Sequence, residues 1–284
     1  MSDADSGQPS EIEQQYNPRL AVPGFEAFFQ ADAERSAATR ERRAHRADVR
    51  YGDGPLQTLD VFPGPKTDGP IHVFIHGGYW RALDKASYSF VADTFCDAGA
   101  TTVLLNYDLC PAVTGDTVVA ETLDGLAWVY RNAQDLGGNP DRICISGHSA
   151  GAHLAAMALA HDWSRHDLPA TPFKAAALIS GIYDPMPVLE IAANADIRLD
   201  ADMAQRNNAI THLPRPGTPF IVAVGGGETR DWIRQSSDYH EACRAAGLQS
   251  TYMRVGTDHH FSITDRLADP DHPMTRAIIG QMGL

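Results

Sequence analysis

The chain has 284 residues, and its hydrophobic content of 43% and charged content of 21% are ordinary for a soluble globular protein. Its net charge of −13 argues against binding to nucleic acid or to an anionic membrane surface, and no apolar run approaches the roughly 18 residues of a membrane span. No signal peptide is visible at the acidic N-terminus and the four cysteines are scattered, so we expect a cytoplasmic protein with reduced thiols.

The N-terminal residues 1–15 are polar and acidic, and they are predicted to be disordered. Residues 16–284 are expected to form a single domain, because no second-domain linker and no internal repeat is visible. This domain begins with an arm over 16–47, whose segment 31–47 is rich in Ala, Arg and Glu and predicts an exposed helix.

Two strands are predicted next, over 48–51 and 58–62, on either side of a Gly-Asp-Gly-Pro turn. A third apolar strand, 71–75, runs directly into the loop His76-Gly77-Gly78-Tyr79-Trp80. Two glycines after a strand let the backbone approach a substrate oxygen without side chains in the way. We therefore expect the N–H groups of Gly78 and Tyr79 to contribute to an oxyanion hole.

Helices and strands then alternate along the chain. The predicted helices cover 85–98, 118–136 and 150–161, and the predicted strands cover 101–107, 142–146 and 175–180. Such alternation predicts the α/β class, with a mostly parallel sheet and helices on both of its faces.

The pentapeptide Gly147-His148-Ser149-Ala150-Gly151 lies between the predicted strand 142–146 and an alanine-rich helix. G-x-S-x-G in that setting is typical of a sharp turn that lifts a nucleophilic serine clear of the sheet. The helix start also offers backbone N–H groups to a developing negative charge. We expect Ser149 to be the nucleophile and the N–H of Ala150 to complete the oxyanion hole.

Residues 182–216 interrupt the alternation with four prolines and short helical pieces. This segment falls where a cap would cover the active site, so a small cap is predicted there.

A catalytic acid is expected after the strand predicted over 218–224. Glu228 is the first carboxylate beyond that strand and is the preferred acid. Asp231 is the alternative, although its position favours the first turn of the following helix, where a negative charge suits the dipole. Asp258 is a further carboxylate near the histidines, and it is expected to be a loop residue.

The catalytic histidine is expected on the loop after the last predicted strand, 249–255, where His259 and His260 compete. Either would take the proton of Ser149 as the serine attacks an acyl carbon, and Glu228 would fix the tautomer of the histidine. Water would then release the acyl group from the serine. No metal or other cofactor is expected, since neither H-E-x-x-H nor paired C-x-x-C occurs.

These motifs resemble the arylformamidase (kynurenine formamidase) branch of the α/β-hydrolases, near the hormone-sensitive-lipase-like esterases. The resemblance extends over nearly the whole chain from Tyr16, on six motifs. They are Y-N-P (16–18), H-G-G-Y-W (76–80), G-H-S-A-G-A-H-L (147–154), S-G-I-Y-D (180–184), R-Q-S (234–236) and H-F (260–261). The H-F pair favours His260 over His259, and counting back from R-Q-S places the acid at Glu228, where the family often has aspartate.

The resemblance implies a small-molecule substrate, an N-formyl aromatic amine such as N-formylkynurenine, and a role in tryptophan catabolism. Tyr79, Trp80 and Tyr183 are expected to bind the aromatic part, although Trp80 alternatively packs in the core beneath the oxyanion loop. Two other hypotheses remain: a short-chain carboxylesterase or amidase, and a non-catalytic binding protein on the same fold. By analogy with the family, the protein is also a candidate homodimer.

Overall fold

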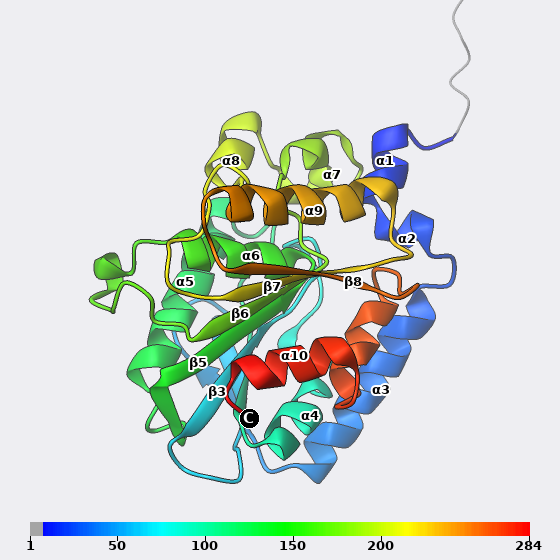
Figure 1. Cartoon of the computed structure of the whole chain (residues 1–284). Helices are drawn as coiled ribbons and strands as arrows, with labels where there is room; N and C mark the ends of the chain where they lie inside the picture. Colours follow the sequence, from blue (N-terminus) through cyan, green and yellow to red (C-terminus); the bar gives the residue numbers. More distant parts are fainter. Residues whose placement is uncertain (1–7) are drawn as a thin grey trace, which may run out of the picture.

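A mixed eight-stranded sheet forms the centre of the computed structural model, which describes residues 8–284 (Figure 1). The strands are β1 (Arg46–Arg50), β2 (Thr58–Phe62), β3 (Gly69–Ile75), β4 (Thr101–Leu105), β5 (Gly138–His148), β6 (Ala175–Ile179), β7 (Phe220–Gly225) and β8 (Ser250–Val255). Their order is β1-β2-β4-β3-β5-β6-β7-β8. Pairs β1–β2 and β2–β4 are antiparallel and all the others are parallel.

Helices cover both faces of this sheet, which confirms the predicted α/β class (Figure 1). The α-helices are α1 (Glu11–Tyr16), α2 (Pro18–Ala21), α3 (Glu26–Arg42), α4 (Val91–Ala98), α5 (Gly115–Arg131), α6 (Ala150–Ala160), α7 (Asn194–Ile197), α8 (Ala201–Arg206), α9 (Arg230–Ala245) and α10 (Pro273–Gln281). Four 3₁₀ helices are η1 (Lys85–Tyr88), η2 (Trp163–His166), η3 (Met186–Glu190) and η4 (Ser262–Ala268). In Figure 1, α5, α6 and α9 lie on one side of the sheet, and α3, α4 and α10 lie on the other.

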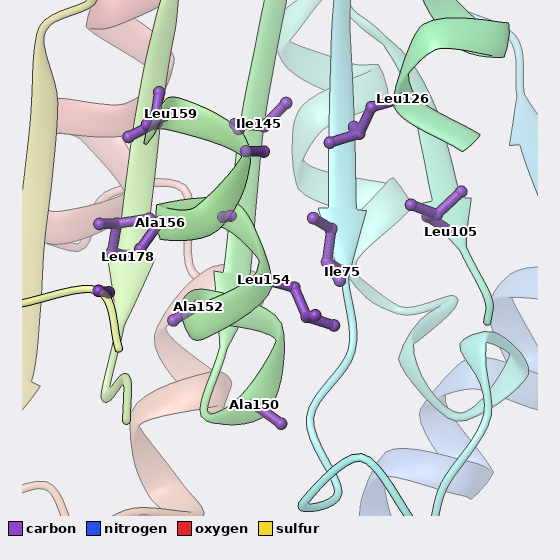
Figure 2. Packing of buried hydrophobic residues seen from close by; sticks show 14 of the residues in the cluster. Ile75, Leu105, Leu126, Ile145, Ala150, Ala152, Leu154, Ala156, Leu159 and Leu178 are labelled. Carbon is purple, nitrogen blue, oxygen red and sulfur yellow. The ribbon is translucent and has the colours of Figure 1, made fainter. Parts of the chain in front are cut away.

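Inner strands such as β3 and β4 are buried on both faces, so neighbouring residues of one strand point into two separate cores. Val73 and Ile75 belong to the core beneath α5 and α6, whereas Phe74 between them belongs to the core beneath α4 and α10. Figure 2 shows the first core, where the small side chains of α6 allow that helix to lie close to β3, β5 and β6.

The N-terminus differs from the prediction. Disorder was expected through residue 15, but α1 begins at Glu11, and the side chain of Ser10 caps it by accepting a hydrogen bond from the N–H of Glu13. Asn17 in turn caps α2 and accepts from the N–H of Arg19. These caps make two short helices out of a polar segment. The part of the predicted disorder over 1–7 lies outside the described residues.

Candidate active site

Ser149 sits on the turn between β5 and α6, with φ 57° and ψ −120°. The turn is possible because glycines flank it on both sides. A Cβ on Gly147 would lie 2.2 Å from the carbonyl oxygen of Gly151, and a Cβ on Gly151 would lie 2.0 Å from the carbonyl oxygen of Ile75. The strained backbone therefore holds the serine hydroxyl above the carboxyl edge of the sheet.

Three side chains from different loops form a hydrogen-bonded chain at this edge. The Oγ of Ser149 lies 3.0 Å from Nε2 of His260, and Nδ1 of His260 lies 2.8 Å from Oε2 of Glu228. All three side chains are buried. The carboxylate can only accept at Nδ1, so Nε2 is left as the acceptor for the serine hydroxyl. This arrangement suits proton transfer from Ser149 to His260.

The second carboxylate oxygen of Glu228 is also held. Its Oε1 accepts a hydrogen bond from Oγ of Ser180 at 2.5 Å and one from the backbone N–H of Gly225 at 2.8 Å. Ser180 follows β6 and has a left-handed φ of 52°. The S-G-I-Y-D motif contains this serine, but sequence reasoning assigned it no role, because its contact with Glu228 depends on the pairing of β6 with β7.

The alternative acids and the alternative histidine lie elsewhere. Asp231 is in the first turn of α9, where its carboxylate contacts Arg230 at 2.9 Å. Asp258 forms two hydrogen bonds with Arg266. Nδ1 of His259 accepts from the backbone N–H groups of Phe261 and Ser262, which keeps this ring in the loop. The structure thus brings Glu228 and His260, and none of these alternatives, to Ser149.

The loop after β3 has an unusual backbone, in which Gly78, Tyr79 and Trp80 have positive φ values of 114°, 54° and 57°. It lies close to the serine, since a Cβ on Gly77 would be 3.1 Å from Cβ of Ser149. Within residues 8–284, the backbone N–H groups of Gly78, Tyr79 and Ala150 have no hydrogen-bond acceptor. Donors left unpaired beside a nucleophile are what an oxyanion hole requires.

A cavity of about 270 Å³ lies beside Ser149 and His260. The arm contributes Asn17, Pro18 and Arg19 to its wall, and the segment after η3 contributes Ile191–Ala193 and Asp196. Four aromatic side chains also line it: Phe29, Tyr79, Tyr88 and Phe261. An aromatic group would find apolar ring faces to contact in this cavity.

Two of the three predicted substrate-binding aromatics are not part of this wall. Trp80 is buried, and its indole N–H donates to Nδ1 of His153 at 3.3 Å, so the ring occupies the alternative position in the core. Tyr183 is also buried and stacks on Tyr239 with ring centroids 4.2 Å apart. The structure therefore does not place Trp80 or Tyr183 in the wall of this cavity, because both rings turn inward.

Two further side chains surround His260. The ring of Trp232 lies edge-on, 4.4 Å from the imidazole, and its N–H donates to the carbonyl of Ser180. Nε2 of His148 donates to the backbone carbonyl of His260 at 2.8 Å. Burial, and then the charge of His260, hold the pKa of His148 well below its usual range. His148 therefore stays neutral and supports the loop that carries His260.

The arm is fastened to several parts of the site. The hydroxyl of Thr229, next to Glu228, donates to the carbonyl of Gln15 at 2.7 Å. The backbone N–H of Asp231 donates to the side chain of Gln15 at 3.1 Å, and the hydroxyl of Tyr79 donates to the carbonyl of Tyr16. These bonds fasten α1 beside the site, and α2, which contributes Pro18 and Arg19 to the cavity wall, follows it directly.

Within the part of the chain that the structure describes, no cluster of three or more His, Cys, Asp or Glu residues could hold a metal ion. Among the same residues, no helix has the length and apolar character needed to cross a membrane.

Comparison with known proteins gives a consistent set of relatives. The family model BD-FAE matches residues 59–196. A kynurenine formamidase of Danio rerio is 31% identical over 100% of this chain and 99% of its own length, and one of Salmo salar is 33% identical over 83% and 81%. Among solved structures, a protein of Silicibacter sp. TM1040, provisionally named a thioesterase, matches with a TM-score of 0.82 and 27% identity, over 96% of this chain and 100% of that chain.

Proposed function

Because the chain belongs to the kynurenine formamidase family of α/β-hydrolases, we propose that it hydrolyses the formamide of an N-formyl aromatic amine, with N-formylkynurenine as the type substrate. The chain is a hydrolase of amides or esters. The observation that carries the proposal is that the Ser149–His260–Glu228 chain of hydrogen bonds borders a cavity with four aromatic side chains in its wall. The formyl group is small, so most of that wall is available to the aromatic leaving group.

In the proposed mechanism, Oγ of Ser149 attacks the formyl carbon while Nε2 of His260 takes the hydroxyl proton. Glu228 accepts the hydrogen bond from Nδ1 and stabilises the imidazolium. The N–H groups of Gly78, Tyr79 and Ala150 would hold the oxyanion. When the C–N bond breaks, His260 gives its proton to the leaving amine. Water, deprotonated by His260, then attacks the formyl ester of Ser149. As the bond from the formyl carbon to Oγ of Ser149 breaks, His260 returns the proton to Oγ and formate leaves.

Several finer statements belong to the same proposal. Residues 182–216, which include η3, α7 and α8, would act as a small cap, since Ile191–Ala193 and Asp196 line the cavity. The reaction would serve tryptophan breakdown in the cytoplasm, where the four buried free cysteines would stay reduced. Assembly of the chain into a homodimer is a prediction, and sedimentation analysis of the purified protein would test it.

The test is kcat/KM for N-formyl-L-kynurenine beside that for a short-chain p-nitrophenyl ester, with Ser149→Ala as the blank. A formamide value of about 10⁴ M⁻¹s⁻¹ or above, lost on the order of 10⁴-fold in Ser149→Ala, is expected. Strong ester turnover with negligible formamide turnover would instead identify a short-chain carboxylesterase. If a fluorophosphonate probe fails to label Ser149 in folded protein, the chain is a non-catalytic binding protein.

A further inference from the structure

Two arginines from distant parts of the chain face the cavity beside Ser149. Arg19 belongs to α2 of the arm, and Arg81 follows the oxyanion loop. The chemistry of the proposed reaction uses neither of them. Two guanidinium groups in one substrate cavity therefore call for a separate explanation.

The guanidinium of Arg19 rests on aromatic rings rather than on an acid. Its Cζ lies 5.2 Å from the ring centroid of Phe25 and 5.9 Å from that of Phe29. Over residues 8–284 it has neither an ion pair nor a hydrogen bond, although Glu26 contributes a favourable charge from beyond ion-pair distance. The side chain is thus oriented by stacking, and its five N–H donors remain available.

Only some of the N–H donors of Arg81 have hydrogen-bond partners. Its Nη1 pairs with Asp196 at 2.5 Å, and this carboxylate is about half exposed. Its Nε is buried and has no hydrogen-bond partner among the described residues. Its Nη2 forms no hydrogen bond in that part of the chain either. Because the Arg81 side chain lines the cavity, this donor is available to a ligand that brings an acceptor.

The charges of the two arginines are not balanced inside the cavity. Asp196 is the one carboxylate that forms an ion pair with either of them in the described chain. Burial, and then the nearby charge of Arg81, lower the pKa of Arg19, which places the two cations within electrostatic reach of each other. One uncompensated positive charge therefore remains on this wall, and an anion would neutralise it.

We propose that Arg19 and Arg81 form a subsite for a carboxylate on the leaving-group part of the substrate. The inference rests on the proposed function and deepens it: the preferred substrates are N-formyl aromatic amines that carry an amino-acid carboxylate, and neutral N-formyl arylamines are poor substrates. Arg19, stacked and without an acid partner, supplies the main contact, and Nη2 of Arg81 supplies a second donor.

The test compares N-formyl-L-kynurenine with its decarboxylated analogue, which has the same formamide and ring. A hydrogen-bonded charge pair predicts that wild-type kcat/KM is about 10- to 100-fold higher for the acid. Arg19→Gln should bring this ratio toward 1, mainly through KM, and Arg81→Gln should lower it as well. In the Ser149→Ala background, calorimetry should show that Arg19→Gln weakens binding of N-formyl-L-kynurenine by a similar factor.

Arg276→Gln is the matched control, because Arg276 is an exposed arginine of α10, which lies on the opposite face of the sheet from α6 (Figure 1). This variant makes the same charge change and should keep the wild-type ratio. A wild-type ratio near 1, or an unchanged ratio in Arg19→Gln, would overturn the subsite.

Failure of the proposed function gives a different result. Ester turnover that depends on Ser149, without formamide turnover, would refute the formamidase function. The carboxylate subsite would then be tested by a second comparison. Aryl acetates with either a carboxylate or a carboxamide on the leaving group would then replace the formamides. A carboxylate preference that disappears in Arg19→Gln would support the subsite, and equal rates for the two esters would refute it.

Discussion

At the scale of single residues, Glu228 has an environment that suits the acid of a triad. One of its oxygens accepts from His260 and the other from Ser180 and Gly225. The longer side chain of glutamate reaches the histidine because these donors fix its far end. Glu228, the first carboxylate after the strand, is thus the residue that contacts His260.

Replacing Glu228 by glutamine should lower kcat/KM by about 10²- to 10⁴-fold, less than Ser149→Ala, because the amide removes the charge that stabilises the imidazolium. Asp231→Asn is the matched control, since Asp231 lies in α9 and contacts arginines instead of His260. We expect the control to stay close to wild type in steady-state kinetics. A larger loss in Asp231→Asn would show that the acid is assigned wrongly.

Ser180 is a positioning residue that acts through Glu228. Ser180→Ala removes one charge-assisted hydrogen bond and should lower kcat about 10-fold while leaving KM nearly unchanged. The split between kcat and KM is the measurement, made on protein whose thermal unfolding shows that it is folded. A normal kcat would mean that Gly225 alone holds the carboxylate.

The sequence was less informative about aromatic residues. Trp80 and Tyr183 lie next to catalytic segments in the chain, but that position does not determine which way a ring points. Three successive positive φ values turn Trp80 toward His153, and the stacking with Tyr239 draws Tyr183 into the core. Such backbone turns and long-range contacts leave no periodic signal in the sequence.

At the scale of helices and strands, most element types were predictable, because the spacing of hydrophobic residues along the chain indicates which side chains are buried. The expected helix 85–98 is broken into η1 and α4, where the N–H of Phe90 donates to Ser36 of α3 instead of continuing one helix. This contact joins residues 54 positions apart, so it could not be predicted locally.

The close packing of α6 on β3 gives a test at this scale. Gly151→Ala should destabilise the protein by about 1–3 kcal/mol or more, because the added Cβ would lie 2.0 Å from the carbonyl oxygen of Ile75. Gly280→Ala in α10 is the matched control, with no heavy atom within 4 Å of its added Cβ. It should stabilise the protein by up to about 1 kcal/mol. Urea unfolding checks both, and equal stability of the two variants would contradict the close approach.

At the scale of the whole molecule, the fold class and family membership were predicted and are confirmed. Alternating strands and helices indicate a parallel sheet, and two motifs at the correct spacing mark the ends of β3 and β5. The cavity was beyond prediction, because its wall combines the arm, the oxyanion loop and the segment after η3. These meet only in the completed fold.

Buried histidines make the stability of the whole fold depend on pH. Burial lowers the pKa of His72 to about 3 and that of His153 to about 4, from 6.5. Between pH 6.5 and pH 4, these two histidines bind protons in the unfolded chain but stay neutral in the folded protein. The free energy of unfolding should therefore fall as pH drops from 6.5 toward 4, by about 1.4 kcal/mol per pH unit for each histidine.

Asp32 works in the opposite direction, since burial raises its pKa to about 6 and the folded state protonates first. Urea unfolding at pH 7 and pH 5 measures the balance, which the histidines should dominate. In His72→Asn the loss of stability between these two pH values should be about 2 kcal/mol smaller than in wild type. An identical pH dependence in the two proteins would mean that His72 titrates normally.

The fastening of the arm also has a consequence for the order of events during synthesis. Gln15 leaves the ribosome early, but its partners Thr229 and Asp231 are made 214 and 216 residues later. At a synthesis rate of about 5–20 residues per second, about 10–40 s pass between the synthesis of α1 and α2 and the synthesis of the residues on which they dock. The wall that carries Arg19 is thus among the first parts to be translated and among the last to be assembled.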